Sequence, residues 1–140
     1  LFRSAAKVAV FQYLIGNTDW DFSMRRNVQL LKMKEGGKIM VLPYDFDFSG
    51  LVSAPYASPN SETGLKSVRD RCLMAEGVDA EALKNAVKLL KEKEKELYQV
   101  CRSKSVPKSA GGAAVEYLQT FFKNMDGKDE VPKIMPMDKE

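Results

Sequence analysis

Two acid-bearing segments lie on either side of a stretch whose pattern is typical of a β-hairpin. They are residues 16–21 (GNTDWD) and residues 44–50 (YDFDFSG). A hairpin brings the chain back to where it started, so oxygen-bearing side chains at its two ends can converge on one side. Carboxylate and amide oxygens are the ligands that hard cations such as Mg²⁺ prefer. The residues predicted to converge are Asp19, Asp21, Asn27, Asp45 and Asp47.

This order of loops would suit phosphoryl transfer. One carboxylate can orient or deprotonate a hydroxyl, while an asparagine and a second carboxylate hold Mg²⁺ against nucleotide phosphates. We expect Asp19 to be the base, and Asn27 and Asp45 to bind the metal and, through it, the nucleotide. Asp47 faces the opposite side if strand geometry continues through Phe46. If the backbone turns there, Asp47 becomes a further metal ligand.

A second interpretation needs no ligand. Asp and Asn side chains commonly bond to nearby backbone groups in turns and at helix ends. Asn17, Asp19 and Asp21 would then be turn or capping residues. Asp45 and Asp47 would accept hydrogen bonds from loop amides.

The residues around the acids also have two interpretations. Arg25 and Arg26 could pair with phosphate, although surface ion pairs with the acids are the simpler expectation. Trp20, Phe46 and Phe48 are expected to anchor the core or the loops rather than to stack on a base.

Composition limits the class of protein. The chain has 140 residues, of which 44% are hydrophobic and 29% charged, as in a soluble globular domain. The net charge of +3 comes from 22 basic and 19 acidic residues spread along the chain, so no nucleic-acid partner is expected. No segment approaches the roughly 20 apolar residues of a membrane span. We expect a soluble protein and favour the cytoplasm.

Histidine is absent from the sequence. This excludes nucleophile systems that depend on a histidine base and metal sites ligated by imidazole. A two-metal phosphoesterase is disfavoured because the sequence offers neither histidine nor a larger carboxylate cluster for a two-metal centre. Any chemistry falls to carboxylates, amides, hydroxyls and lysines.

Apolar periodicity predicts a helix over residues 2–15, which Gly16 ends. Strands are predicted over residues 28–33 and 39–42, around a Gly-Gly turn. Residues 49–64 are predicted to form a long loop.

The remainder is predicted to be helical. Ser67 and Asp70 resemble a capping pair that opens a short helix over residues 67–76. Asp79 is a plausible N-cap for a long helix that continues to residue 102.

The last amphipathic helix is predicted over residues 113–125. Residues 127–140 form a charged tail that we expect to fray, unless Ile134, Met135 and Met137 attach it to the body. The predicted fold class is α+β and predominantly α-helical, with helices around one small β-hairpin. One domain covers residues 1–126.

The acidic segments carry a family likeness. FQYLIGNTDWDFSMRRN at residues 11–27, followed by PYDFDFSG, resembles the catalytic and metal loops of atypical protein-kinase-like folds. HipA-type kinases have a GNTD…N loop, and CotH-type kinases have a WD…N loop with a later D-x-D. The likeness covers residues 2–50, and the later helices are similar to a kinase C-terminal lobe in general character.

This resemblance implies an ATP-dependent phosphotransferase that uses Mg²⁺. By likeness, Asp19 matches the catalytic aspartate, with Asp21 as the alternative base. Asn27 and Asp45 match the metal-binding pair, and Asp47 is a possible second aspartate.

The resemblance also implies an N-terminal lobe with a Gly-rich loop and a strand lysine, for which these residues hold no recognisable counterpart. We therefore expect a further lobe or a partner protein to complete the nucleotide site. The alternative is a non-catalytic interaction or structural domain, with residues 49–64 as its contact surface.

Overall fold

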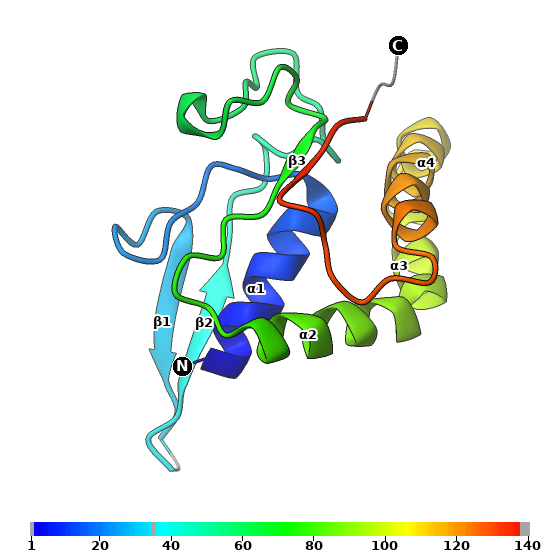
Figure 1. The fold of residues 1–140 in the computed structure, drawn as a ribbon. Helices are drawn as coiled ribbons and strands as arrows, with labels where there is room; N and C mark the ends of the chain where they lie inside the picture. The colour runs from blue at the N-terminus through cyan, green and yellow to red at the C-terminus, as the bar shows by residue number, and fades with distance from the viewer. Residues whose placement is uncertain (1, 35, 138–140) are drawn as a thin grey trace.

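Helices dominate the structure, and a small antiparallel hairpin lies at one edge beside α1, which is the α+β class expected from the sequence (Figure 1). A computed structural model describes residues 2–34 and 36–137. In chain order the elements are α1 (Phe2–Ile15), β1 (Val28–Lys32), β2 (Ile39–Pro43), the 3₁₀ turn η1 (Ser61–Thr63), β3 (Arg71–Cys72), α2 (Ala80–Glu92), α3 (Glu94–Cys101), α4 (Lys108–Asn124) and β4 (Ile134–Met135). Within the described ranges, no helix combines the length and the apolar character that crossing a bilayer requires.

Helix α1 lies at the centre, between the hairpin on one side and α4 on the other (Figure 1). Its buried residues Val10, Tyr13 and Leu14 form one core with α2, α4 and the C-terminal segment. The Tyr13 ring packs edge-on against Phe121 of α4, with ring centres 6.1 Å apart. Because α1 is packed on several sides, its C-terminal end is held in place, and so is the start of the loop that follows it.

The end of α1 is as predicted. Gly16 has φ of 66°, the left-handed conformation that glycine adopts without a side-chain clash. The N–H of Gly16 bonds to the carbonyl of Tyr13, and the N–H of Asn17 to that of Gln12. These bonds are those of a Schellman cap, which turns the chain sharply away from the helix axis.

The hairpin also forms where it was predicted. Leu30 pairs with Val41 and Leu31 with Met40 in an antiparallel register. Its inner face places Val28 and Val41 in a second apolar cluster with Val8, Ala9 and Trp20. The hairpin is therefore fixed against α1 through one buried residue of each strand.

The helix predicted over residues 67–76 is wrong. The Asp70 carboxylate accepts the N–H of Ser67, and the Ser67 hydroxyl accepts the N–H of Arg69, so the pair closes a tight turn. The chain then enters strand β3, where Arg71 pairs with Met135 of β4. This pairing satisfies backbone groups that a helix would have satisfied internally.

The long helix predicted over residues 79–102 is divided. Asp79 is the N-cap, as expected, and its carboxylate accepts the N–H of Ala82 at 2.8 Å. The chain leaves helical geometry at Lys93, whose φ and ψ are −97° and 4°. Beyond this break, Tyr98 of α3 packs edge-on against Phe122 of α4. Packing on α4 thus outweighs the continuation of a straight, solvent-covered helix.

The charged tail attaches to the body through the apolar residues noted in the sequence. Met135 is buried, and β4 pairs with β3. The N–H of Met137 donates to the Asp70 carboxylate at 3.0 Å. The segment lies between α4 and β3 (Figure 1), so the fraying expected for the tail does not apply to residues 131–137.

Candidate functional site

The two acidic loops lie side by side because main-chain hydrogen bonds join them. Asn17 and Ser49 form an antiparallel bridge. The N–H of Gly50 donates to the carbonyl of Gly16, and that of Leu51 to the carbonyl of Ile15, both at 3.0 Å. The return of the chain through the hairpin, inferred from the sequence, thus brings residues 44–50 back to residues 16–21.

Close packing at this junction depends on two glycines. A β-carbon added to Gly16 or to Gly50 would overlap the hydroxyl of Tyr117. That hydroxyl is held in place because it donates to the carbonyl of Arg69 at 2.9 Å. Helix α4 therefore fixes the base of both loops.

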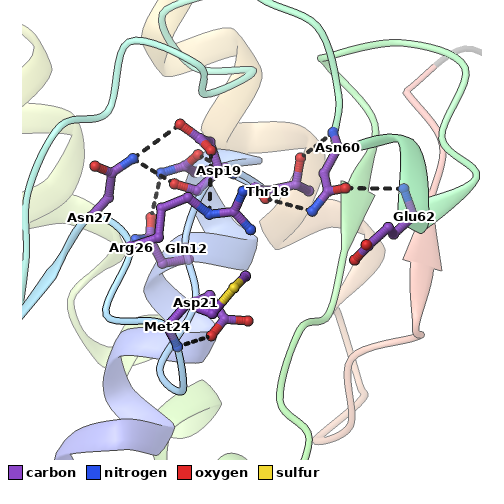
Figure 2. Close-up of polar contacts among 10 residues, drawn as sticks. Gln12, Thr18, Asp19, Asp21, Met24, Arg26, Asn27, Asn60 and Glu62 are labelled. Carbon is purple, nitrogen blue, oxygen red and sulfur yellow. Dashed lines mark hydrogen bonds and ion pairs between the residues drawn. The ribbon is translucent and has the colours of Figure 1, made fainter.

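Asp19 is oriented by its neighbours (Figure 2). The amide nitrogen of Asn27 donates to the Asp19 carbonyl at 2.7 Å and to its carboxylate Oδ2 at 3.0 Å. Arg26 Nε lies 3.7 Å from the other carboxylate oxygen, Oδ1. Two of the residues predicted for the site, Asp19 and Asn27, are thus in direct contact across eight positions of sequence.

Asp45 and Asp47 lie close enough for their charges to interact. Hydrogen bonding to the Asp47 carboxylate, followed by repulsion from it, raises the pKa of Asp45, and the charge of Asp19 adds to the rise. The backbone turns at Asp45, where φ is 58°, rather than continuing as a strand through Phe46. The turn accounts for both aspartates lying on the same side.

Asn27 and Asp45 share an uncommon backbone conformation. Both have positive φ, 53° and 58°, in a region that costs free energy for residues with a side chain. They lie at the same, open end of the hairpin, Asn27 just before β1 and Asp45 just after β2, and the N–H of Tyr44 bonds to the carbonyl of Asn27 at 3.0 Å. The hairpin therefore ends in two strained turns that both carry a predicted metal ligand.

Asp21 and Asn17 have local structural roles. The Asp21 carboxylate accepts the N–H of Met24 at 2.7 Å and the hydroxyl of Ser23 at 2.6 Å. The bond from Met24, then that from Ser23, lowers the pKa of Asp21. Asn17 is fully buried, donates to Gln12 and accepts the N–H of Asp19. In Figure 2, Asp21 lies with Met24, apart from Asp19 and Asn27.

The aromatic residues anchor structure, as expected. Trp20 is 2% exposed and packs edge-on against Phe22 with ring centres 4.7 Å apart. Phe46 contacts Phe11 of α1 in the same manner at 5.8 Å. Trp20 faces the core while its neighbour Asp19 is partly exposed, so the first loop is fixed from within.

One residue of this region was missed by the sequence analysis. Tyr56, in the loop after Ser49, donates its hydroxyl to Asp47 Oδ2 at 3.1 Å. Hydrogen bonding to Asp47 and the negative charge of that carboxylate raise the pKa of Tyr56. No local spacing marks a contact of this kind, because the conformation of an irregular loop decides it.

The donor set fits a hard cation better than a soft one. Two carboxylates at one turn and an amide at the other provide oxygen atoms, and repulsion between the carboxylates is relieved when a cation binds between them. Within the residues that the structure describes, no group of three or more His, Cys, Asp or Glu side chains has the geometry of a metal site. A cation here would be held by Asp45 and Asp47, with Asn27 or water completing its shell.

A separate large cleft is lined in part by residues of the first acidic loop. Its volume is about 990 Å³, and its lining includes Trp20, Asp21, Cys72 and Lys133. None of the four residues proposed for base or metal roles lines it. We base the candidate site on the clustered carboxylates, since hydrogen bonds and charge interactions join Asp19, Asn27, Asp45 and Asp47.

Comparison with protein-family models, with curated proteins and with solved structures finds no match to this chain.

Proposed function

We propose that this chain is the C-terminal-lobe portion of an atypical kinase-like phosphotransferase. The observation that carries the proposal is the convergence of the two acidic loops, which sets Asp19, fixed by Asn27, beside Asp45 and Asp47. The resemblance of residues 11–27 and 43–50 to kinase catalytic and metal loops gives the same assignment.

Asp19 would act on the acceptor hydroxyl. With Oδ2 held by Asn27 and Oδ1 near Arg26, its carboxylate has a fixed direction and can orient the hydroxyl and accept its proton. The acceptor oxygen bonds to the terminal phosphorus of ATP as the bond from that phosphorus to its bridging oxygen breaks, and ADP leaves.

Asn27, Asp45 and Asp47 would bind Mg²⁺, which supplies neutralisation of phosphate charge. Asp45 and Asp47 already repel one another, so their affinity for a cation includes relief of this repulsion. Because no Gly-rich loop or strand lysine is recognisable in these residues, we infer that a further lobe or a partner protein supplies the remaining contacts to ATP.

The test is calorimetric titration with Mg²⁺, with and without ATP, of the wild-type chain and the Asp45→Ala variant. Asp21→Asn is the matched control, because Asp21 lies in the neighbouring loop with its carboxylate turned to Met24 and Ser23. The proposal requires metal binding that Asp45→Ala abolishes and Asp21→Asn retains. Equal binding by the two variants, or none by the folded wild-type chain, would sink it.

A second candidate is a non-catalytic interaction domain. The outer face of the hairpin favours it, because Leu31, Met40 and Leu42 are each 42–44% exposed on adjacent strands. Contiguous exposed apolar residues of this kind commonly mark contact surfaces. On this reading Asp45→Asn changes stability but leaves metal binding at the level of the wild type.

A further inference from the structure

The turn end of the hairpin, residues 30–42, is an apolar surface that the rest of the described chain leaves open. Six of its large apolar side chains are each 40–46% exposed, namely Leu30, Leu31, Met33, Ile39, Met40 and Leu42. In Figure 1 the turn between β1 and β2 projects beyond both α1 and α2. A contiguous apolar surface of this kind marks a contact with another surface.

The exposed side chains lie on both faces of the hairpin. Leu31 and Met40 are paired on the outer face. Leu30 pairs with Val41, and Ile39 lies two positions from Val41, so both belong to the inner face. Helix α1 covers only the part of the inner face nearer the open end. A rigid protein partner would cover one face of this projection, whereas the fluid surface of a bilayer can surround it on both.

Lysines accompany the apolar side chains. Residues 30–42 contain three lysines and one glutamate, a net charge of +2. Lys32, Lys34 and Lys38 are all exposed. A lysine can lay its apolar stem along a hydrophobic surface while its ammonium group reaches a polar phase. Anionic lipid headgroups attract lysines held near them, so the charge of the turn end complements an anionic membrane surface.

The backbone of the hairpin limits how deeply it can enter a membrane. Strands β1 and β2 form a sheet of their own, and within the described residues no third strand pairs with its edges. Exposed lysines such as Lys32 on β1 hinder edge-to-edge pairing with another chain. The unpaired edge groups need water, so the hairpin can reach the headgroups and the start of the acyl chains but not the dry hydrocarbon.

We propose that the turn end of the hairpin binds the surface of an anionic phospholipid membrane. Its apolar side chains enter the boundary between headgroups and acyl chains, and Lys32, Lys34 and Lys38 contact the lipid phosphates. Neither acidic loop takes part in this contact. The inference is therefore independent of the proposed phosphotransferase function.

The experiment is sedimentation of the whole chain with lipid vesicles. One set of vesicles contains equal parts of phosphatidylcholine and phosphatidylserine, and the other contains phosphatidylcholine alone. We expect binding to the anionic vesicles that weakens as salt is added, and far weaker binding to the neutral ones. Met40→Glu should weaken binding to the anionic vesicles at least about 10-fold, because it replaces an apolar contact with a repelled charge. Val100→Glu is the matched control, since Val100 is a 68% exposed apolar residue of α3, and it should bind as the wild type does.

A second pair of variants tests the charge without changing a strand. Lys34 lies in the turn, so Lys34→Gln leaves the pairing of β1 and β2 intact. It should weaken binding to the anionic vesicles about 5-fold. Lys104→Gln, which changes an exposed lysine between α3 and α4, should leave binding unchanged. Thermal unfolding midpoints of Lys34→Gln and Lys104→Gln should equal that of the wild type.

Three results would each overturn the inference. The first is a folded wild-type chain that binds neither kind of vesicle, or both kinds equally. The second is equal binding to the anionic vesicles by Lys34→Gln and Lys104→Gln. The third is a dimer in analytical ultracentrifugation that Met40→Glu converts to a monomer, which would assign the turn end to a second copy of the chain.

Discussion

At the scale of single residues, the central feature is a set of carboxylates held together at the end of the hairpin. Asp45 is exposed and yet has a raised pKa, because Asp47 and then Asp19 disfavour its charged form. Asp21, two positions from Asp19, has a lowered pKa because turn hydrogen bonds favour its charged form. At neutral pH the ionised Asp45 therefore lowers the stability of the fold, whereas the ionised Asp21 raises it.

This difference predicts opposite pH dependences. The folded state holds the Asp45 proton more tightly than the unfolded chain, so protonated Asp45 stabilises the fold. This stabilisation is fully present below the ordinary aspartate pKa of 3.8 and is lost as the pH rises through the raised pKa of Asp45 in the folded state. Asp45→Asn should therefore match wild type near pH 3 and exceed its stability at pH 7. Asp21→Asn should be less stable than wild type at pH 7 and approach it in acid. Thermal unfolding over this pH range checks both, and equal pH profiles for the two variants would contradict the account.

The convergence of the acids could be predicted because it depends on short-range signals. Gly16 and the turn before residue 39 fix where the chain leaves and returns, so the positions of Asp19, Asn27 and Asp45 follow from the hairpin. The contact of Tyr56 with Asp47 could not be predicted, since the two residues lie nine positions apart in an irregular loop. The roles of these residues in catalysis and metal binding remain predictions.

At the scale of elements, local patterns succeeded where a segment is stabilised by its own cap or turn. Helix α1, the hairpin and the Asp79 cap are of this kind. The prediction for residues 67–76 failed because a Ser and an Asp three positions apart can close a turn as well as open a helix. Strand β3 has only two residues and finds its partner, Met135, far along the chain. A pairing of that range leaves no local pattern.

Helix α4 gives a matched pair for an element-scale prediction. A β-carbon on Gly111 would overlap the carbonyl oxygen of Cys101, whereas one on Gly112 would meet open space. Gly112→Ala should stabilise the fold by roughly 0.5–1 kcal/mol, because alanine loses less backbone entropy than glycine in a helix. Gly111→Ala should destabilise it, because α4 must move away from the end of α3. Urea unfolding of both variants measures this, and a stabilising Gly111→Ala would refute the packing described here.

At the scale of the whole molecule, one buried arginine joins segments that are distant in sequence. Arg71 is fully buried and donates to the carbonyls of Leu14 and Tyr117 and to the hydroxyl of Thr120. Its guanidinium carbon lies 4.0 Å from the centre of the Tyr117 ring. Burial lowers the pKa of this guanidinium, so hydrogen bonds must offset the cost of desolvating the charge. The end of α1, where the first acidic loop begins, is thus tied to α4.

Replacement of Arg71 should therefore destabilise the entire fold. Arg71→Met removes the side-chain donor to the buried Leu14 carbonyl and one of the donors to the Tyr117 carbonyl, to which the Thr120 hydroxyl still donates. We expect a loss of roughly 1.5–3 kcal/mol in the free energy of unfolding. Arg69→Met is the control, because Arg69 stacks on the same ring from 5.1 Å and should cost less than about 1 kcal/mol. Urea denaturation compares them, and similar losses in both variants would disprove a special role for Arg71.

The proposal that the two acidic loops bind a cation is tested most directly by mapping where the cation binds. Mn²⁺ added to the isotopically labelled chain broadens the amide NMR signals of residues near it. We expect selective broadening at Asp19, Asn27, Asp45 and Asp47, with the signals of α3 retained. Broadening centred on the acidic residues of α2 and α3, or no selective broadening at all, would contradict the proposed site.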